Sequence, residues 1–210
     1  MAERAVLVDW RAPRSLYSCG LAALAALLPE GSAAPEAAFL RTHSTPRGGS
    51  WQKLLDRALQ SPDVTDAPLL SLAGELSMHR IEMLTVALAA AVEMDLMCGR
   101  AISHLQAPLG GSRPTLGLLA AAFVEIESQE RVIECLLTGS AVQSGLLHLL
   151  NENAPVAERA AAVPVPLCLA LGGRDASWPG TSLGLAGIAE TPLPPSVLAE
   201  AKRQARGLAT

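Results

Sequence analysis

The sequence predicts a mainly α-helical protein in which a helical N-terminal segment precedes a winged-helix-like domain with a small β-hairpin wing. Three observations predict this. Half of the 210 residues are apolar, which is enough for a sizeable core. Apolar side chains recur at helical spacing through most of the chain. Short extended stretches follow the last of these helices, and short helices before a hairpin are the outline of a winged-helix unit.

The N-terminal segment, residues 1–68, is expected to contain two helices. The first covers Tyr17 to Leu28 and is stopped by Pro29. Residues 29–49 are rich in Ala, Pro, Ser and Gly and are expected to form a mobile connection. Ser50 is placed to cap the second helix, which ends before Pro62 and leads into a turn over 61–68.

The winged-helix-like domain is expected to cover residues 69–173, with a buried helix at its centre. Leu69 to Gly74 is a possible short helix before it. Ser77 is the expected N-cap of the central helix, and Glu82 lies too late to complete a capping box with Ser77. From residue 81 to residue 92 the helix is apolar on all faces, which is typical of a buried element.

The elbow, residues 93–115, connects the central helix to the rest of the domain. Asp95 is expected to cap a helix that ends at Gln106, because the following Pro and Gly residues cannot continue it without cost. Thr115 then caps the next helix. The remaining expected elements are helices over 115–126 and 129–137, a turn of helix capped by Ser140, strands over 146–150 and 158–163, and a helix over 167–171. Residues 174–210 are expected to be a linker and a short terminal helix.

The sequence resembles the winged-helix region that precedes the ATPase module in AAA+ ATPases associated with phage-tail-like extracellular contractile injection systems. In that family a helix of FE-x-x-LLLLALAPELD character leads to GRLYAYLQDD, then to an RPT helix start and a GLL strand. The matching residues here, in order, are Glu93, Asp95, Gly99, Arg100, Leu105, Gln106, Arg113, Pro114, Thr115, Gly145, Leu146 and Leu147. The similarity covers about residues 69–173.

The resemblance implies a non-catalytic interaction or regulatory region that docks a partner or positions an ATPase module. The implied partners are an attached or associated AAA+ module and an injection-system component, and oligomers would form through that module. The chain departs from the family after Gln106, where it has Ala107 and Pro108 in place of charged residues. No GxxxxGK[ST] motif occurs in the 210 residues, so we expect no ATP hydrolysis by this chain alone; the full gene product could still be an ATPase.

The expected partner-binding surface combines the polar side of the elbow with the wing, residues 151–159. The residues proposed for it are Arg100, Gln106, Arg113, Asn151, Glu152 and Arg159. The two elbow arginines have a second interpretation, as internal ion-pair partners of Glu93 or Asp95.

Two other classes of function rank below an interaction module. A winged-helix DNA-binding regulator is second, since SRPTLGLL resembles the start of a helix-turn-helix recognition helix. The charge opposes it: residues 114–150 contain four glutamates and one arginine, and we expect no nucleic-acid partner. An enzyme is third, with no catalytic, cofactor or metal residues assigned, because the histidines are scattered and a GxSxG motif is absent. A stand-alone interaction protein is the remaining alternative.

The cysteines and the apolar runs indicate a cytoplasmic protein outside the membrane. The four cysteines, at positions 19, 98, 135 and 168, lie far apart and are expected to be buried thiols. The longest apolar stretch runs from Met83 to Val92 and is too short to span a bilayer.

Overall fold

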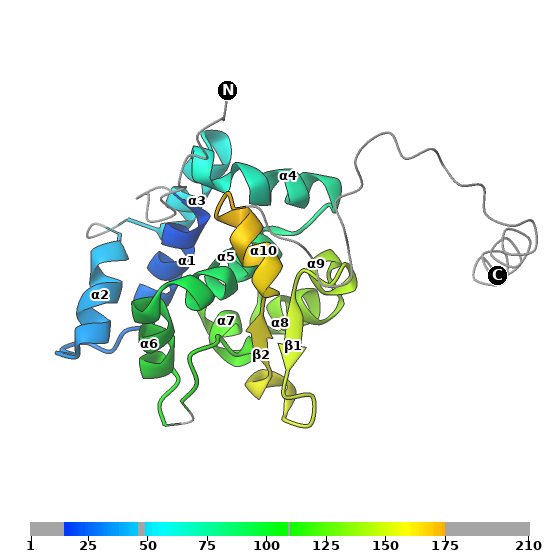
Figure 1. The fold of residues 1–210 in the computed structure, drawn as a ribbon. Helices are drawn as coiled ribbons and strands as arrows, with labels where there is room; N and C mark the ends of the chain where they lie inside the picture. The colour runs from blue at the N-terminus through cyan, green and yellow to red at the C-terminus, as the bar shows by residue number, and fades with distance from the viewer. Residues whose placement is uncertain (1–14, 46–48, 109, 175–210) are drawn as a thin grey trace, which may run out of the picture. The chain divides into compact units, whose positions relative to one another are not determined.

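A computed structural model describes residues 15–45, 49–108 and 110–174, and this part is mainly helical with a small two-stranded antiparallel sheet (Figure 1). The fold class expected from the sequence is confirmed. The elements are α1 (Leu16–Ala25), α2 (Pro35–His43), α3 (Trp51–Gln60), the 3-10 turn η1 (Val64–Asp66), α4 (Ala67–Glu75), α5 (Arg80–Met94), α6 (Leu96–Leu105), α7 (Leu116–Ala122), α8 (Gln129–Thr138), α9 (Ser140–Gln143), β1 (His148–Leu150), the 3-10 turn η2 (Val156–Glu158), β2 (Ala160–Ala162) and α10 (Val165–Leu171).

The central helix α5 is buried on nearly all sides, as its sequence predicts. Leu84 and Leu88 are fully buried within it. The expected cap is wrong: Ser77 has a positive φ of 52°, and His79 is the N-cap. Glu82 therefore falls at the third helical position and completes a capping box with His79. With Ser77 as the cap, Glu82 lay too late in the sequence to form such a box.

Helix α1 packs directly on α5, and a glycine permits the close contact. A Cβ built on Gly20 would lie 2.7 Å from Cγ of Leu88, so the side chain of Leu88 fills the space that Gly20 leaves empty. The described residues on both sides of position 68 belong to one compact unit. The N-terminal helices and the winged-helix-like region thus share one core.

The connection expected over residues 29–49 contains helix α2, so that part of the prediction is wrong. Pro35 occupies the first helical position, where a missing N–H costs nothing. Ala37 and Leu40 are fully buried, and α2 packs against α1 and α6. These two buried side chains anchor α2 on the core, in a segment otherwise rich in small residues.

Two of the later helices begin at the caps expected from the sequence, Asp95 and Thr115, and a third helix, α8, begins at Ser128. Asp95 accepts from Met97 N at 2.8 Å, Thr115 from Leu118 N at 3.3 Å, and Ser128 from Arg131 N at 3.4 Å. Helix α7 ends at Ala122, four residues before the expected end, and Phe123 beyond it is fully buried. Gly139, not Ser140, is the N-cap of α9.

The hairpin joins β1 and β2, and a short extended segment before α7 extends it. The register pairs His148 with Ala162, Leu149 with Ala161 and Leu150 with Ala160. An isolated bridge joins Thr115 to Ala160 on the other side of β2. The order α6, bridge, α7, α8, β1, β2 is that of a winged-helix unit. Both strands are shorter than the sequence indicates.

Helix α10 closes the described part of the chain and packs on α5 and α4 (Figure 1). It begins two residues before the expected position, with Pro166 in its first turn. The linker and terminal helix expected beyond residue 174, and the first 14 residues, lie outside the described residues. None of the described helices has the length and apolar character that a membrane crossing requires.

Candidate interaction surface

Arg100 projects from α6 and forms an ion pair with Glu36 at the start of α2. Its Nε and one terminal nitrogen lie 2.9 and 2.6 Å from Glu36 Oε1. The pKa of Glu36 is lowered, first by its backbone hydrogen bond and then by the hydrogen bond from Arg100. The internal ion pair expected for Arg100 exists, but with Glu36 and not with Glu93 or Asp95. Arg100 therefore fixes α2 to α6.

Arg113 forms the other ion pair of the elbow. Its Nε and terminal nitrogen lie 2.9 and 2.7 Å from Glu93 Oε1, which confirms one of the two internal partners expected for this arginine. The side chains of Arg113 and Glu93 are 43 % and 23 % exposed. The pair joins the two ends of the elbow, and part of the guanidinium still faces solvent.

Gln106 holds the Gly-rich turn in shape. Its Nε2 donates to the backbone oxygens of Gly111 and Arg113 at 3.0 and 3.1 Å. Its Oε1 accepts from Thr115 N at 2.7 Å. One side chain thus binds both ends of the turn and positions the cap of α7, so Gln106 has a structural role.

The wing carries the more exposed members of the predicted surface. Asn151 follows β1 with a φ of 62°, and its backbone oxygen accepts from Ala154 N at 2.8 Å, which closes the turn. Asn151 and Glu152 are exposed. Arg159 is half-buried, and its Nε donates to Ala154 O at 3.3 Å. Its side chain stabilises the wing from within.

Three of the six predicted residues line two open grooves. The first groove, between α6, α7 and η2, is lined by Gln106 together with Leu118, Ala157 and Glu158. The second lies beside β1 and is lined by Glu152 and Arg159 with apolar residues of α8 and α9. The elbow and the wing meet in the first groove, because Gln106 of the elbow and Glu158 of the wing both line it. Arg100, Arg113 and Asn151 line neither groove.

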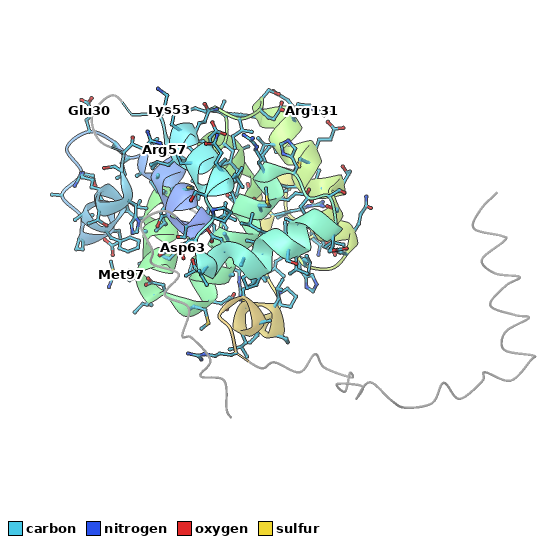
Figure 2. All side chains as sticks on the ribbon, turned by 90° about the horizontal axis from the view of Figure 1, so that it is seen from above. Glu30, Lys53, Arg57, Asp63, Met97 and Arg131 are labelled. Carbon is cyan, nitrogen blue, oxygen red and sulfur yellow. The ribbon has the colours of Figure 1, made fainter. Side chains whose placement is uncertain are left out.

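The outer face of α8, which occupies the recognition-helix position, is acidic. Glu130 and Glu134 are exposed there, Glu127 is exposed just before the N-cap of the helix, and Arg131, the one cation of α8, lies 2.5 Å from Glu134. Figure 2 shows Arg131 of this face on the opposite side of the body from Met97 of α6. A surface of this charge repels a phosphate backbone.

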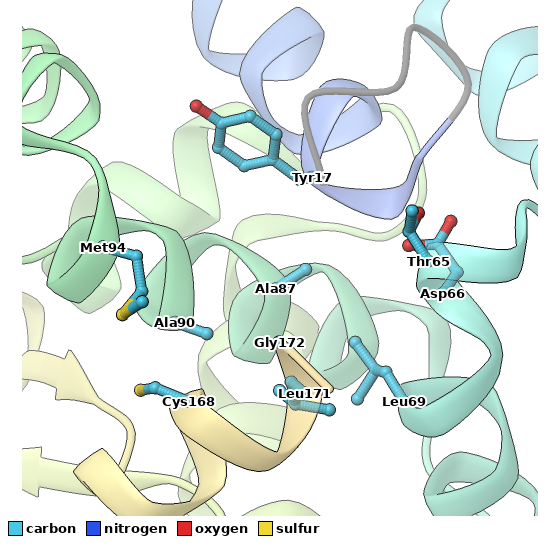
Figure 3. A pocket seen from close by; sticks show the side chains of 10 residues that line it. All are labelled: Tyr17, Thr65, Asp66, Leu69, Ala87, Ala90, Met94, Cys168, Leu171 and Gly172. Carbon is cyan, nitrogen blue, oxygen red and sulfur yellow. The ribbon is translucent and has the colours of Figure 1, made fainter. Parts of the chain in front are cut away.

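A small cavity of about 60 Å³ lies between α1, η1, α5 and α10 (Figure 3). Tyr17, Ala87, Ala90 and Cys168 contribute to its lining, and Asp66 is at one end. Asp66 is 7 % exposed and accepts from Leu16 N at 2.8 Å. Burial raises the pKa of Asp66 to about 6 despite this bond, and nearby Asp63 adds to the rise. The volume admits one small apolar group, which is too little for a substrate pocket.

The thiols of the described residues are buried or partly buried. Burial raises the pKa of Cys19 and Cys98 to about 12, so both thiols stay protonated at neutral pH. Both are buried, as is Cys168, whereas Cys135 is only partly so. Among the residues that the structure describes, none of the histidine, cysteine, aspartate and glutamate side chains cluster in a group that could hold a metal ion.

Sequence reasoning missed the buried carboxylate of Glu82. It is 3 % exposed; its Oε2 accepts from His79 N, and its Oε1 accepts from Ala141 N, both at 2.7 Å. A Cβ on Gly139 would lie 2.3 Å from Oε1, so only glycine fits beside it. The usable signal was His79 three residues before Glu82, which is a capping-box spacing with an uncommon cap residue.

Comparison of the chain with models of protein families, with curated proteins and with solved structures gives no match.

Proposed function

We propose that this chain is a non-catalytic interaction region of an AAA+ ATPase that accompanies a contractile injection system. It would act in the cytoplasm, where it docks a partner or positions the ATPase module. The partners would be that module, attached or associated, and an injection-system component. Oligomers would form through the module.

The observation that carries this proposal is the set of elbow residues that resemble the family. Asp95 caps α6, Gln106 binds both ends of the Gly-rich turn, and Thr115 caps α7. These residues hold the geometry of the elbow, so their ordered occurrence supports a shared architecture. The surface charge supports protein recognition, because the outer face of α8 carries more carboxylates than cations.

A DNA-binding regulator is the second candidate, and the helix order with a wing favours it. The acidic face of α8 and the exposed Glu152 and Glu158 of the wing oppose it. We expect weak binding of duplex DNA that disappears by physiological salt. A footprint at a defined sequence in moderate salt would reverse this ranking.

The proposed function is tested by reading the frame and the neighbouring genes beyond Thr210 and by assaying the purified chain for ATP turnover. We expect a GxxxxGK[ST] motif in the same frame or in an adjacent gene, and no turnover by the chain alone. Turnover by these 210 residues would refute the non-catalytic assignment. A neighbourhood without any such ATPase would leave a stand-alone interaction protein as the better account.

A further inference from the structure

Strand β1 is an edge strand, and the hydrogen bonds of β2 show which of its residues face outward. Ala161 N donates to Pro114 O at 2.8 Å, so the backbone groups of Ala161 point away from β1. In an antiparallel pair the direction of these groups alternates along each strand. Ala160 and Ala162 therefore face β1.

The alternation leaves one residue of β1 with its backbone groups on the open side. His148 and Leu150 are the partners of Ala162 and Ala160, so their N–H and C=O groups point to β2. Leu149, between them, points its N–H and C=O away from the sheet. No hydrogen bond from another described residue reaches either group. An unpaired donor and acceptor on an edge strand are the groups that a further strand would bind.

A groove lies beside β1. Leu137 of α8 and Val142 of α9 line it together with Leu149 and Leu150, and all four side chains are half-buried. The residues of β2 do not line it. The groove thus offers apolar contacts beside the free backbone groups of Leu149, which is the combination used in strand addition.

The charge around the groove favours a cation on the occupant. Glu152 lines the groove and is exposed, and its carboxylate makes no hydrogen bond with another described residue. Arg159 also lines it, but its Nε is engaged by Ala154 O. Glu134 and Glu130 lie on the same side of α8 as Leu137, one and two turns before it, and Glu134 is paired with Arg131.

We infer that β1 is a docking strand for an extended segment of a partner protein. Such a segment adds an antiparallel or parallel strand at Leu149, places alternate apolar side chains against Leu137 and Val142, and brings a lysine or arginine to Glu152. This inference rests on the proposed function and specifies its surface. It places the contact beside the wing, whereas the elbow arginines contribute to internal ion pairs.

The test uses the full chain as bait for a displayed library of random ten-residue peptides, followed by affinity measurements on the enriched peptides. We expect enriched peptides to show alternating apolar residues with at least one basic residue. In amide hydrogen exchange, such a peptide should protect Leu149, whose amide we expect to exchange quickly in the free chain because no described residue accepts a hydrogen bond from it. His148 and Leu150 should already be protected in the free chain by their bonds to β2.

Variants locate the peptide on the groove. Leu149→Pro removes the outward N–H donor, which does not serve the hairpin, and also the leucine side chain that lines the groove, so it should weaken binding at least about fivefold. Val142→Lys should abolish most of the binding, and Val124→Lys, at a valine that is 52 % exposed and does not line the groove, is its control. Glu152→Lys should weaken binding about two- to fivefold. Glu158→Lys is the matched wing variant that lines the other groove and should have no effect.

Several results would overturn the inference. One is a library that enriches no peptide, and another is enriched peptides whose affinity is the same for Val142→Lys and Val124→Lys. Protection of Leu149 that rises with chain concentration in the absence of peptide would indicate a second copy as the occupant and would also refute it. The selection needs no ATPase, so its outcome is independent of whether the proposed ATPase exists.

Discussion

The carboxylate of Glu82 accepts a hydrogen bond from the backbone N–H of Ala141 at 2.7 Å, across 59 residues of sequence. The same side chain caps α5 through His79 N. It therefore joins the start of the central helix to the start of α9, in a site that is 3 % exposed.

Glu82→Ala should destabilise the fold because it leaves two N–H donors without their acceptor. We expect a loss of roughly 2–5 kcal/mol in the free energy of unfolding, measured by chemical denaturation. Glu75→Ala, at an exposed glutamate of α4, is the control and should change it by less than about 0.5 kcal/mol. Equal effects of the two substitutions would mean that the Glu82 contacts contribute nothing.

Leu88→Ala should cost roughly 2–5 kcal/mol, since it removes a fully buried side chain from the centre of the core, and Leu84→Ala should cost a similar amount. Less than about 0.5 kcal/mol for both would place α5 on the surface.

The contact between Gly20 and Leu88 provides a double-mutant test of the packing between α1 and α5. Gly20→Ala alone should destabilise by roughly 1–3 kcal/mol, because its Cβ would overlap the Leu88 side chain. In the Leu88→Ala background the same change should be neutral or stabilising, since alanine favours the helix. Additive effects of the two substitutions in thermal or chemical unfolding would contradict this packing.

The raised pKa of Asp66 predicts a specific dependence of stability on pH. Burial raises its folded pKa to about 6 from an ordinary value of 3.8. Because the folded state binds this proton more tightly than the unfolded state, the associated stability is complete below about pH 4 and is lost as the pH rises to about 6. Asp66→Asn keeps an oxygen for Leu16 N–H and removes the titration.

The unfolding free energy of the wild type should therefore fall relative to Asp66→Asn between pH 4 and 6, by roughly 1–3 kcal/mol. Above pH 6 the difference should be constant. Denaturant titrations of both proteins at each pH check this. Parallel profiles across the range would show that Asp66 titrates near its ordinary value in the folded chain.

The elbow side chains should differ in their effect on stability. Gln106→Ala removes the acceptor of Thr115 N and three donor contacts, and should cost roughly 1–3 kcal/mol. Arg113→Ala breaks a partly exposed ion pair and should cost less than about 1 kcal/mol. The reverse order in unfolding experiments would contradict the structural role of Gln106.

Local signals in the sequence predicted much of the fold. The caps at Ser50, Asp95 and Thr115 and the apolar character of α5 each depend on a few neighbouring residues. The errors came from long-range contacts. Helix α2 has little periodicity of its own and is held by burial against α1 and α6, and no sequence rule pairs Arg100 with Glu36.

The candidate surface was predictable in composition but not in geometry. The exposed wing and the excess of glutamate were readable from the chain. Gln106, Arg100 and Arg113 form bonds within the chain. These bonds depend on how the elbow closes. The backbone N–H and C=O of Leu149 point outward because of the register of β1 against β2. The sequence of a three-residue strand does not reveal this register.

The most direct test of the central claim is amide hydrogen exchange of the full chain with and without the AAA+ ATPase that the proposed function expects in its frame or beside its gene. If the chain docks a protein through its winged-helix-like region, protection should appear at β1 and at the end of α8, and adding duplex DNA at physiological salt should produce none. Protection by DNA at the outer face of α8, together with none from the ATPase, would contradict the account and identify the chain as a DNA-binding regulator.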